Sequence, residues 1–217
     1  MPQRPRIKPR PEVALAGAGV LASAAFAALT AKTLEPRTIF RDLRFRRAIP
    51  FYGRKTKKVV VPFGDLAKEW AVVPAAGAVA AFLLKEGRKA GAAAVLSATS
   101  TGIAASHVFD RTLPQKTPPP GRRAPFDAHY PSGHALHSAT FLSIAAWVLG
   151  REGMAPPKTL AVGAGALAAS LGVDRLMHDR HWPSDVAGGW LAALAIGAFT
   201  AAVYEHLSSP KESPSRQ

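Results

Sequence analysis

Residues 174–185 read D-R-L-M-H-D-R-H-W-P-S-D and join two long apolar runs. This stretch brings Arg175, His181 and Asp185 to the end of segments that are long enough to cross a membrane. Ionisable groups are costly to place there, so they are candidates for function. The alternative is a polar loop between two helices that happens to contain histidines. The remainder of the chain is needed to decide between these interpretations.

Apolar runs without Asp, Glu, Lys or Arg occupy nearly half of the chain. A helix that spans a bilayer needs about 20 apolar residues, and the longer runs reach this length. Their high Ala and Gly content lets helices approach closely inside a bilayer. The sequence therefore predicts an all-α fold, a bundle of six transmembrane helices. The runs lie at residues 13–31, 70–84, 90–109, 135–149, 160–173 and 186–204.

The first run and the connection after it each allow two interpretations. A basic leader precedes residues 13–31, so this run is either a retained helix, which we favour, or a cleaved signal peptide. Residues 32–68 form a long basic connection that contains I-F-R-D-L-R-F-R-R. That pattern fits a short amphipathic helix on a membrane surface, or a solvated run of charge, which we favour.

The charge of the chain is strongly positive. Its 217 residues contain 28 Lys and Arg against 14 Asp and Glu, which gives a formal net charge of +14. The basic residues lie in loops and tails, which suits an anionic membrane surface or a phosphorylated substrate better than nucleic acid. The chain has no cysteine, which excludes disulfides, thiolate catalysis and cysteine-ligated metal.

The apolar runs also define the domain organisation. We expect a basic disordered tail at residues 1–11, a single membrane domain at 12–206 and a polar tail at 207–217. With six spans both tails lie on one side, together with the basic connections between the second and third and between the fourth and fifth helices. The positive-inside tendency makes that side cytoplasmic. The basic connection at 32–68 then lies outside, against the tendency, although long loops count less.

Two polar clusters then share the outer face, at residues 110–134 and 174–185. Cations in these clusters suit the oxygens of a phosphate group, and arginine binds such oxygens in a bidentate manner. A single loop cation is more often merely solvated, but here the cations accompany histidines and a carboxylate. The candidate phosphate-binding cations are Lys116, Arg122, Arg123 and Arg175.

The residues Pro131-Ser132-Gly133-His134 directly precede an apolar run. Ser132 is a good N-cap, and Gly133 lets the backbone approach an anion closely. The free N–H groups at a helix N-terminus favour a phosphate. A capping turn alone would explain these residues, but it would not explain a histidine where the helix enters the bilayer. His134 is therefore a candidate general acid.

His181 and Asp185 are four residues apart and share a face on a helical turn. A carboxylate on one imidazole nitrogen fixes the tautomer and leaves the other nitrogen as a nucleophile. The competing interpretation is a metal site with His178, His181 and Asp185 as ligands. Neighbouring arginines would repel a cation and favour an anion. We therefore expect no metal, and we expect His178 to have a packing or supporting role.

These residues resemble the motifs of the type 2 phosphatidic acid phosphatase superfamily, which also includes undecaprenyl-diphosphate phosphatases and the vanadium haloperoxidases. The second family motif, Pro-Ser-Gly-His, matches in full at residues 131–134. The third motif matches at Arg175, His181 and Asp185, but Asp174 replaces its serine. In the first motif, Lys116 and Arg123 keep the spacing, but the proline that should follow directly comes one residue late.

The resemblance implies the fold of this superfamily and the hydrolysis of a lipid phosphate or diphosphate, without metal or other cofactor, through a phosphohistidine intermediate. His181 would form that intermediate, oriented by Asp185, and His134 would be the acid. The residues Lys116, Arg123, Arg175, Ser132 and Gly133 would bind the phosphate. Asp174 places negative charge beside this site.

The expected location is the plasma membrane, with the active site on the outer face and with membrane lipids as partners. Phosphatidic acid and undecaprenyl diphosphate present the same kind of group to the site, so the sequence does not choose between them. The alternative is a catalytically weak membrane protein that binds anionic lipid or assists lipid transport.

Overall fold

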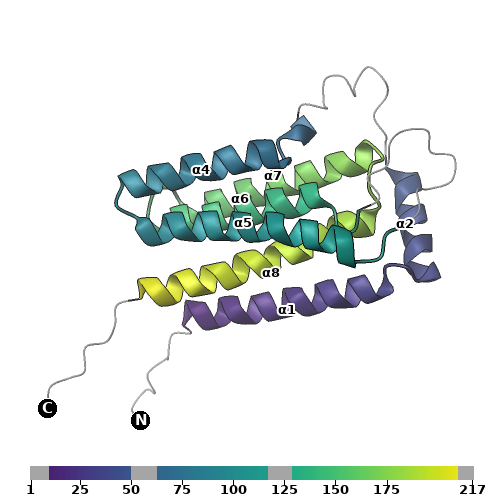
Figure 1. Cartoon of the computed structure of the whole chain (residues 1–217), viewed down its shortest axis with the longest axis horizontal. Coiled ribbons are helices and arrows are strands. Elements are labelled where there is room, and N and C mark those ends of the chain that lie inside the picture. The colour runs from purple at the N-terminus through teal and green to yellow at the C-terminus, as the bar shows by residue number, and fades with distance from the viewer. Residues whose placement is uncertain (1–9, 50–62, 117–128, 210–217) are drawn as a thin grey trace, which may run out of the picture.

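The computed structural model describes residues 10–49, 63–116 and 129–209, and these residues contain no strand. Figure 1 shows long helices packed side by side along one axis, with α2 lying across one end of the bundle. The helices are α1 Pro11–Lys32, α2 Pro36–Ala48, α4 Glu69–Lys85, α5 Lys89–Thr112, α6 Gly133–Arg151, α7 Pro157–Met177 and α8 Pro183–Ser208.

Each of the predicted apolar runs lies in one of the long helices, α1 and α4 to α8. Four of these helices, α1, α5, α7 and α8, are long and apolar enough to cross a membrane. Helix α4 has only 17 residues and, like α6, is outside that set. The prediction of an all-α bundle is therefore confirmed. The predicted count of six membrane spans is not fully confirmed, because four of the described helices meet these criteria of length and apolar composition.

Prolines and glycines mark where the helices begin and turn. Proline occupies the first position of α1, α2, α7 and α8, where its missing N–H costs no helical hydrogen bond. Gly87 (φ 75°) separates α4 from α5, and Gly153 (φ 71°) separates α6 from α7. Glycine adopts this left-handed conformation without strain, so both connections are short.

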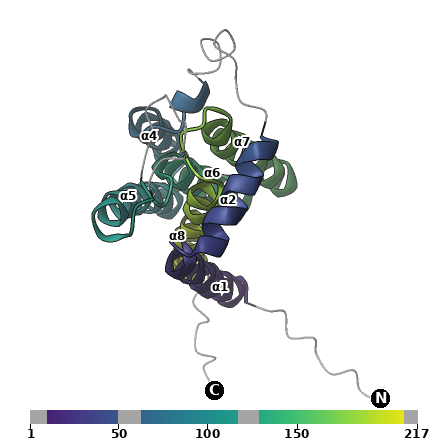
Figure 2. The ribbon, with the colours of Figure 1, turned by 90° about the vertical axis from the view of Figure 1, so that its right-hand side faces the viewer.

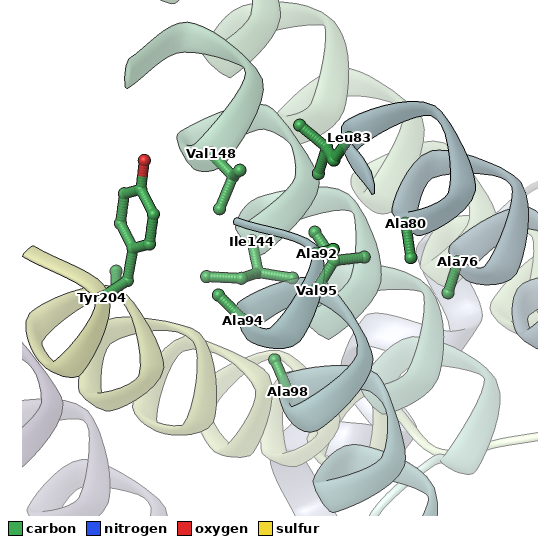
Figure 3. Packing of buried hydrophobic residues seen from close by; sticks show 11 residues of the cluster. Ala76, Ala80, Leu83, Ala92, Ala94, Val95, Ala98, Ile144, Val148 and Tyr204 are labelled. Carbon is green, nitrogen blue, oxygen red and sulfur yellow. The ribbon is translucent and has the colours of Figure 1, made fainter. Parts of the chain in front are cut away.

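The core is built largely from small side chains. Figure 3 shows alanines of α4 and α5 close to Val95, and Ile144 and Val148 of α6 beside them. The side chains of Val95 and Val148 are completely buried. Small residues let the helix backbones approach closely, as the Ala-rich composition predicts.

The basic stretch after α1 is helical. Residues 36–48 form α2, so our preference for a solvated charge run is wrong with respect to secondary structure. The structure supplies the physical reason. Asp42 is buried, and it accepts hydrogen bonds from α8, so this stretch packs on the bundle instead of extending into solvent.

The ends of the helices place the predicted polar clusters together. Helices α5 and α7 end, and α6 and α8 begin, at the end of the bundle across which α2 lies (Figure 1). Helix α1 begins and α8 ends at the opposite end. The short turns at Gly87 and Gly153 also lie at that opposite end, because they join the other ends of the same helices.

Candidate active site

The two predicted motif segments are in direct backbone contact. The Ser132 N–H donates a hydrogen bond to the Asp185 carbonyl oxygen, with an N···O distance of 2.9 Å. Gly189 makes this approach possible, because a Cβ there would lie 2.7 Å from the Ser132 carbonyl oxygen and 2.9 Å from Ala135 Cβ. Helix α6 therefore begins against the first turns of α8, so the segments that carry His134 and His181 lie side by side.

His181 and Asp185 adopt the expected relative placement at the start of α8. His181 Nδ1 lies 3.6 Å from Asp185 Oδ2, and both side chains are buried. The same carboxylate oxygen accepts a hydrogen bond from the Trp182 N–H at 2.9 Å, which caps the helix. The separation between Nδ1 and Oδ2 is longer than a hydrogen bond, and Nδ1 is the ring nitrogen that faces Asp185.

Lys116 is buried beside this turn. Its Nζ lies 2.7 Å from Oδ2 of Asp42 and 3.4 Å from Oδ1 of Asp185, and it also contacts Ser184 Oγ. The ring of Trp182 lies beneath it, with the centroid 5.8 Å from Nζ. An ammonium group has three N–H donors, and three oxygens face it here.

Asp42 links α2 to the N-terminus of α8. Its Oδ1 accepts a hydrogen bond from the Ser184 N–H at 3.0 Å, and its Oδ2 accepts one from Ser184 Oγ at 2.7 Å. A carboxylate is therefore bound by a backbone N–H, a hydroxyl and an ammonium group. Phosphate oxygens use the same three kinds of donor, so this position is suited to anions.

Arg175 is paired with its neighbour in the chain. Asp174 Oδ2 lies 2.5 Å from Arg175 Nη2 and 3.2 Å from its Nε, and both side chains are buried. His178 Nδ1 lies 3.1 Å from Asp174 Oδ1 and 3.0 Å from the Asp174 carbonyl oxygen. Gly64 packs against this pair so tightly that any Cβ there would collide with both side chains. His178 thus supports Asp174, in agreement with the expected supporting role.

His134, in the first turn of α6, lies near an acidic group that the motifs do not contain. The pKa of Asp65 is below its ordinary value, mainly because Lys68 donates a hydrogen bond to it, with smaller contributions from the charges of Arg175 and His134. Asp65 is therefore within electrostatic reach of both residues.

Ser132 and Gly133 keep their predicted places at the start of α6. Ser132 is fully buried, and its Oγ has no hydrogen-bond partner among the described residues. A Cβ at Gly133 would come no closer than 3.6 Å to His137, an ordinary contact. Neighbouring side chains therefore do not require glycine at this position.

Two predicted cations cannot be placed. Arg122 and Arg123 lie outside the described residues. The other predicted site residues are brought together at the same end of the bundle. In the described ranges, no group of three or more His, Asp or Glu residues is arranged to hold a metal ion.

Sequence reasoning missed Asp42 and Ser184. Ser184 lies within the motif stretch, but its side chain received no role. Asp42 is the lone acid in a run of arginines, and it lies four residues before Arg46. Asp42 and Arg46 are on the face of α2 that is turned toward the bundle. A lone acid in a basic helix was the available signal, but it does not identify a partner.

The fold is that of an integral membrane protein in which the described motif residues gather at one end of a helical bundle (Figure 1). The model of the PAP2 superfamily matches residues 75–208, and the chain belongs to this superfamily. This confirms the resemblance that the motifs indicated.

One solved structure shares the fold. It is described as the first transmembrane PAP2-type phosphatidylglycerolphosphate phosphatase from Bacillus subtilis. The TM-score is 0.75 at 18% sequence identity, and the match covers 88% of this chain and 98% of that chain. No curated protein matches the sequence.

Proposed function

We propose that this protein is a membrane phosphatase that hydrolyses a lipid phosphate monoester or diphosphate through a phosphohistidine, without a metal. Membership of the PAP2 superfamily supports a phosphatase. The observation that carries the proposal is the contact between the two motif segments, in which the Ser132 N–H bonds the Asp185 carbonyl oxygen while the Asp185 carboxylate faces His181.

In the first step, His181 Nε2 attacks the phosphorus atom and the bond from phosphorus to the leaving oxygen breaks. His134 gives its proton to that oxygen as general acid. Asp185 holds the His181 ring by Nδ1 and stabilises its positive charge as the P–N bond forms. In the second step, His134 takes a proton from water, the water oxygen attacks phosphorus, and the P–N bond breaks to release inorganic phosphate.

The negative charge on the phosphoryl oxygens is balanced by Lys116, Arg123 and Arg175, and by backbone N–H groups at Ser132 and Gly133. In the structure Lys116 and Arg175 already pair with Asp42 and Asp174. A substrate phosphate must therefore compete with carboxylates for these cations.

The substrate is a lipid because the site lies at the end of a bundle whose helices cross the membrane. The structural relative is described as acting on phosphatidylglycerolphosphate, a phosphate monoester, and that class is a direct candidate here. Phosphatidic acid and undecaprenyl diphosphate present comparable groups. We place the site on the outer face of the plasma membrane, from the distribution of basic residues.

The test is phosphate release by purified protein in detergent from phosphatidate, phosphatidylglycerolphosphate and undecaprenyl diphosphate. His181→Ala should abolish release, and acid-labile labelling of the protein by radioactive phosphate should disappear with it. His206→Ala is the matched control, since His206 is exposed near the opposite end of α8. Activity should persist in EDTA, because the charges that bind phosphate are lysine and arginine. Equal release by His181→Ala and wild type would leave the lipid-binding alternative.

A further inference from the structure

Helix α2 has two unlike faces. Its inner face carries Asp42 and Arg46, which are four residues apart. Asp42 binds Ser184 and Lys116, as described above. Arg46 forms a bidentate pair with Asp179 in the turn between α7 and α8, with Nε–Oδ1 and Nη2–Oδ2 distances of 2.8 Å each. Two ion pairs thus fix the rotation of α2 about its own axis.

The outer face is basic and aromatic. Arg37, Phe40, Arg44 and Arg47 follow each other at spacings of three and four residues, so they lie along one stripe of the helix. All four are exposed, and Phe40 is 66% exposed. The acid of the described helix Pro36–Ala48, Asp42, points to the other side, so nothing on α2 neutralises this stripe.

The position of α2 suits a membrane boundary. Figure 2 shows α2 crossing the end of the bundle beside α7 and α8, and Figure 1 shows that its axis runs across the long helices. Because several of those helices are long and apolar enough to cross a membrane, a helix across their ends would run roughly parallel to the membrane surface (Figure 1). Basic helices with exposed aromatic side chains bind the boundary between headgroups and acyl chains.

We propose that the outer face of α2 is a docking surface for anionic phospholipid headgroups of the surrounding bilayer. Charge complementarity selects this occupant, because the stripe offers three guanidinium groups and no carboxylate. Bidentate donors suit the phosphodiester of a lipid, and Phe40 enters the boundary region beside it. This docking goes beyond catalysis, because it requires no phosphate hydrolysis.

The absence of native cysteine permits a direct test. Phe40→Cys is labelled with an environment-sensitive fluorophore, and the full chain is reconstituted in nanodiscs of phosphatidylcholine with increasing phosphatidylglycerol. The emission should shift to the blue as the anionic fraction rises. A second variant adds Arg37→Gln, Arg44→Gln and Arg47→Gln to the labelled protein, and it should need a several-fold higher phosphatidylglycerol fraction for the same shift.

The matched control adds Lys85→Gln, Lys89→Gln and Lys158→Gln instead, which removes the same charge from exposed positions at the opposite end of the bundle. Its emission should shift with phosphatidylglycerol as much as that of the labelled Phe40→Cys protein without further substitutions. An emission that ignores phosphatidylglycerol, or an equal loss of response in both triple variants, would overturn the proposal. Inorganic phosphate added to pure phosphatidylcholine nanodiscs should cause no shift, and a shift there would mean that free anion is the ligand. Phosphate release by the same samples tests the proposed function separately.

Discussion

Lys116 Nζ and Asp42 Oδ2 lie 2.7 Å apart, in a pair whose side chains are 3% and 5% exposed. The two residues are 74 positions apart in the chain, and Asp42 is on a helix outside the main bundle. The other oxygen contacts of the ammonium group among the described residues are with Ser184 and Asp185, both in the first turn of α8. Asp42 is therefore the partner that a phosphate can replace with the least disturbance of the site.

We expect Asp42→Asn to lower the KM for the lipid phosphate, because an amide competes less strongly for Lys116 than a carboxylate does. A tenfold change corresponds to about 1.4 kcal/mol, and we expect an effect of roughly that size. Inhibition by inorganic phosphate should strengthen in parallel. Both are measured by steady-state kinetics in detergent.

Asp179→Asn is the control for this prediction, because it breaks the other ion pair of α2 without touching Lys116. If both variants changed KM equally, a loosened α2 would be the cause, and competition at Lys116 would be refuted. A higher KM in Asp42→Asn alone would also refute it.

Asp174→Ser should raise kcat/KM, since it removes the carboxylate that binds Arg175. The variant should also unfold at lower temperature, because Arg175 and His178 lose a buried partner, at a cost of about 3–5 kcal/mol. Kinetics and thermal unfolding measured on the same preparation separate the two effects. Asp174→Asn, which keeps the shape but removes the charge, should change in the same direction. Reduced kcat/KM in both variants would show that Asp174 assists the reaction.

Gly189→Ala should slow phosphate release and destabilise the fold. The added methyl group would meet the Ser132 carbonyl oxygen and Ala135 Cβ, so α6 must move away from α8 and carry His134 with it. Overpacking of this kind costs about 1–3 kcal/mol. Gly163→Ala is the control, because a Cβ there meets nothing within 4 Å. Unchanged kcat in Gly189→Ala would mean that the contact between the motif segments tolerates displacement.

Glu205→Ala should lower stability without changing KM. Glu205 is 3% exposed and accepts hydrogen bonds from Trp147 Nε1 at 3.1 Å and from Arg151 Nη2 at 2.7 Å. Their loss should cost about 1–3 kcal/mol, seen as a lower Tm. The rise of α8 places Glu205 roughly 30 Å from Ser184, too far to disturb the site. Glu86→Ala, at an exposed position, is the control and should leave Tm unchanged. A raised KM in Glu205→Ala would contradict the prediction.

The sequence alone determined the long helices α1 and α4 to α8 and the two motif segments at residues 131–134 and 174–185. Apolar runs predict spanning helices because each helix satisfies its own backbone hydrogen bonds inside a bilayer, whatever its neighbours are. The motif spacing at Arg175, His181 and Asp185 is also local, so the facing of His181 and Asp185 could be predicted. Even the misfit at Asp174 was visible, although its pairing with Arg175 was not.

Only the tertiary structure decided which distant groups meet. Asp42 pairs with Lys116, and Arg46 pairs with Asp179, because the packing of α2 across the bundle end brings them within reach. An isolated stretch of arginines is equally compatible with a solvated loop, so its pattern contains no information about a partner. Long-range ion pairs depend on helix packing, and packing is a property of the whole chain rather than of any one segment.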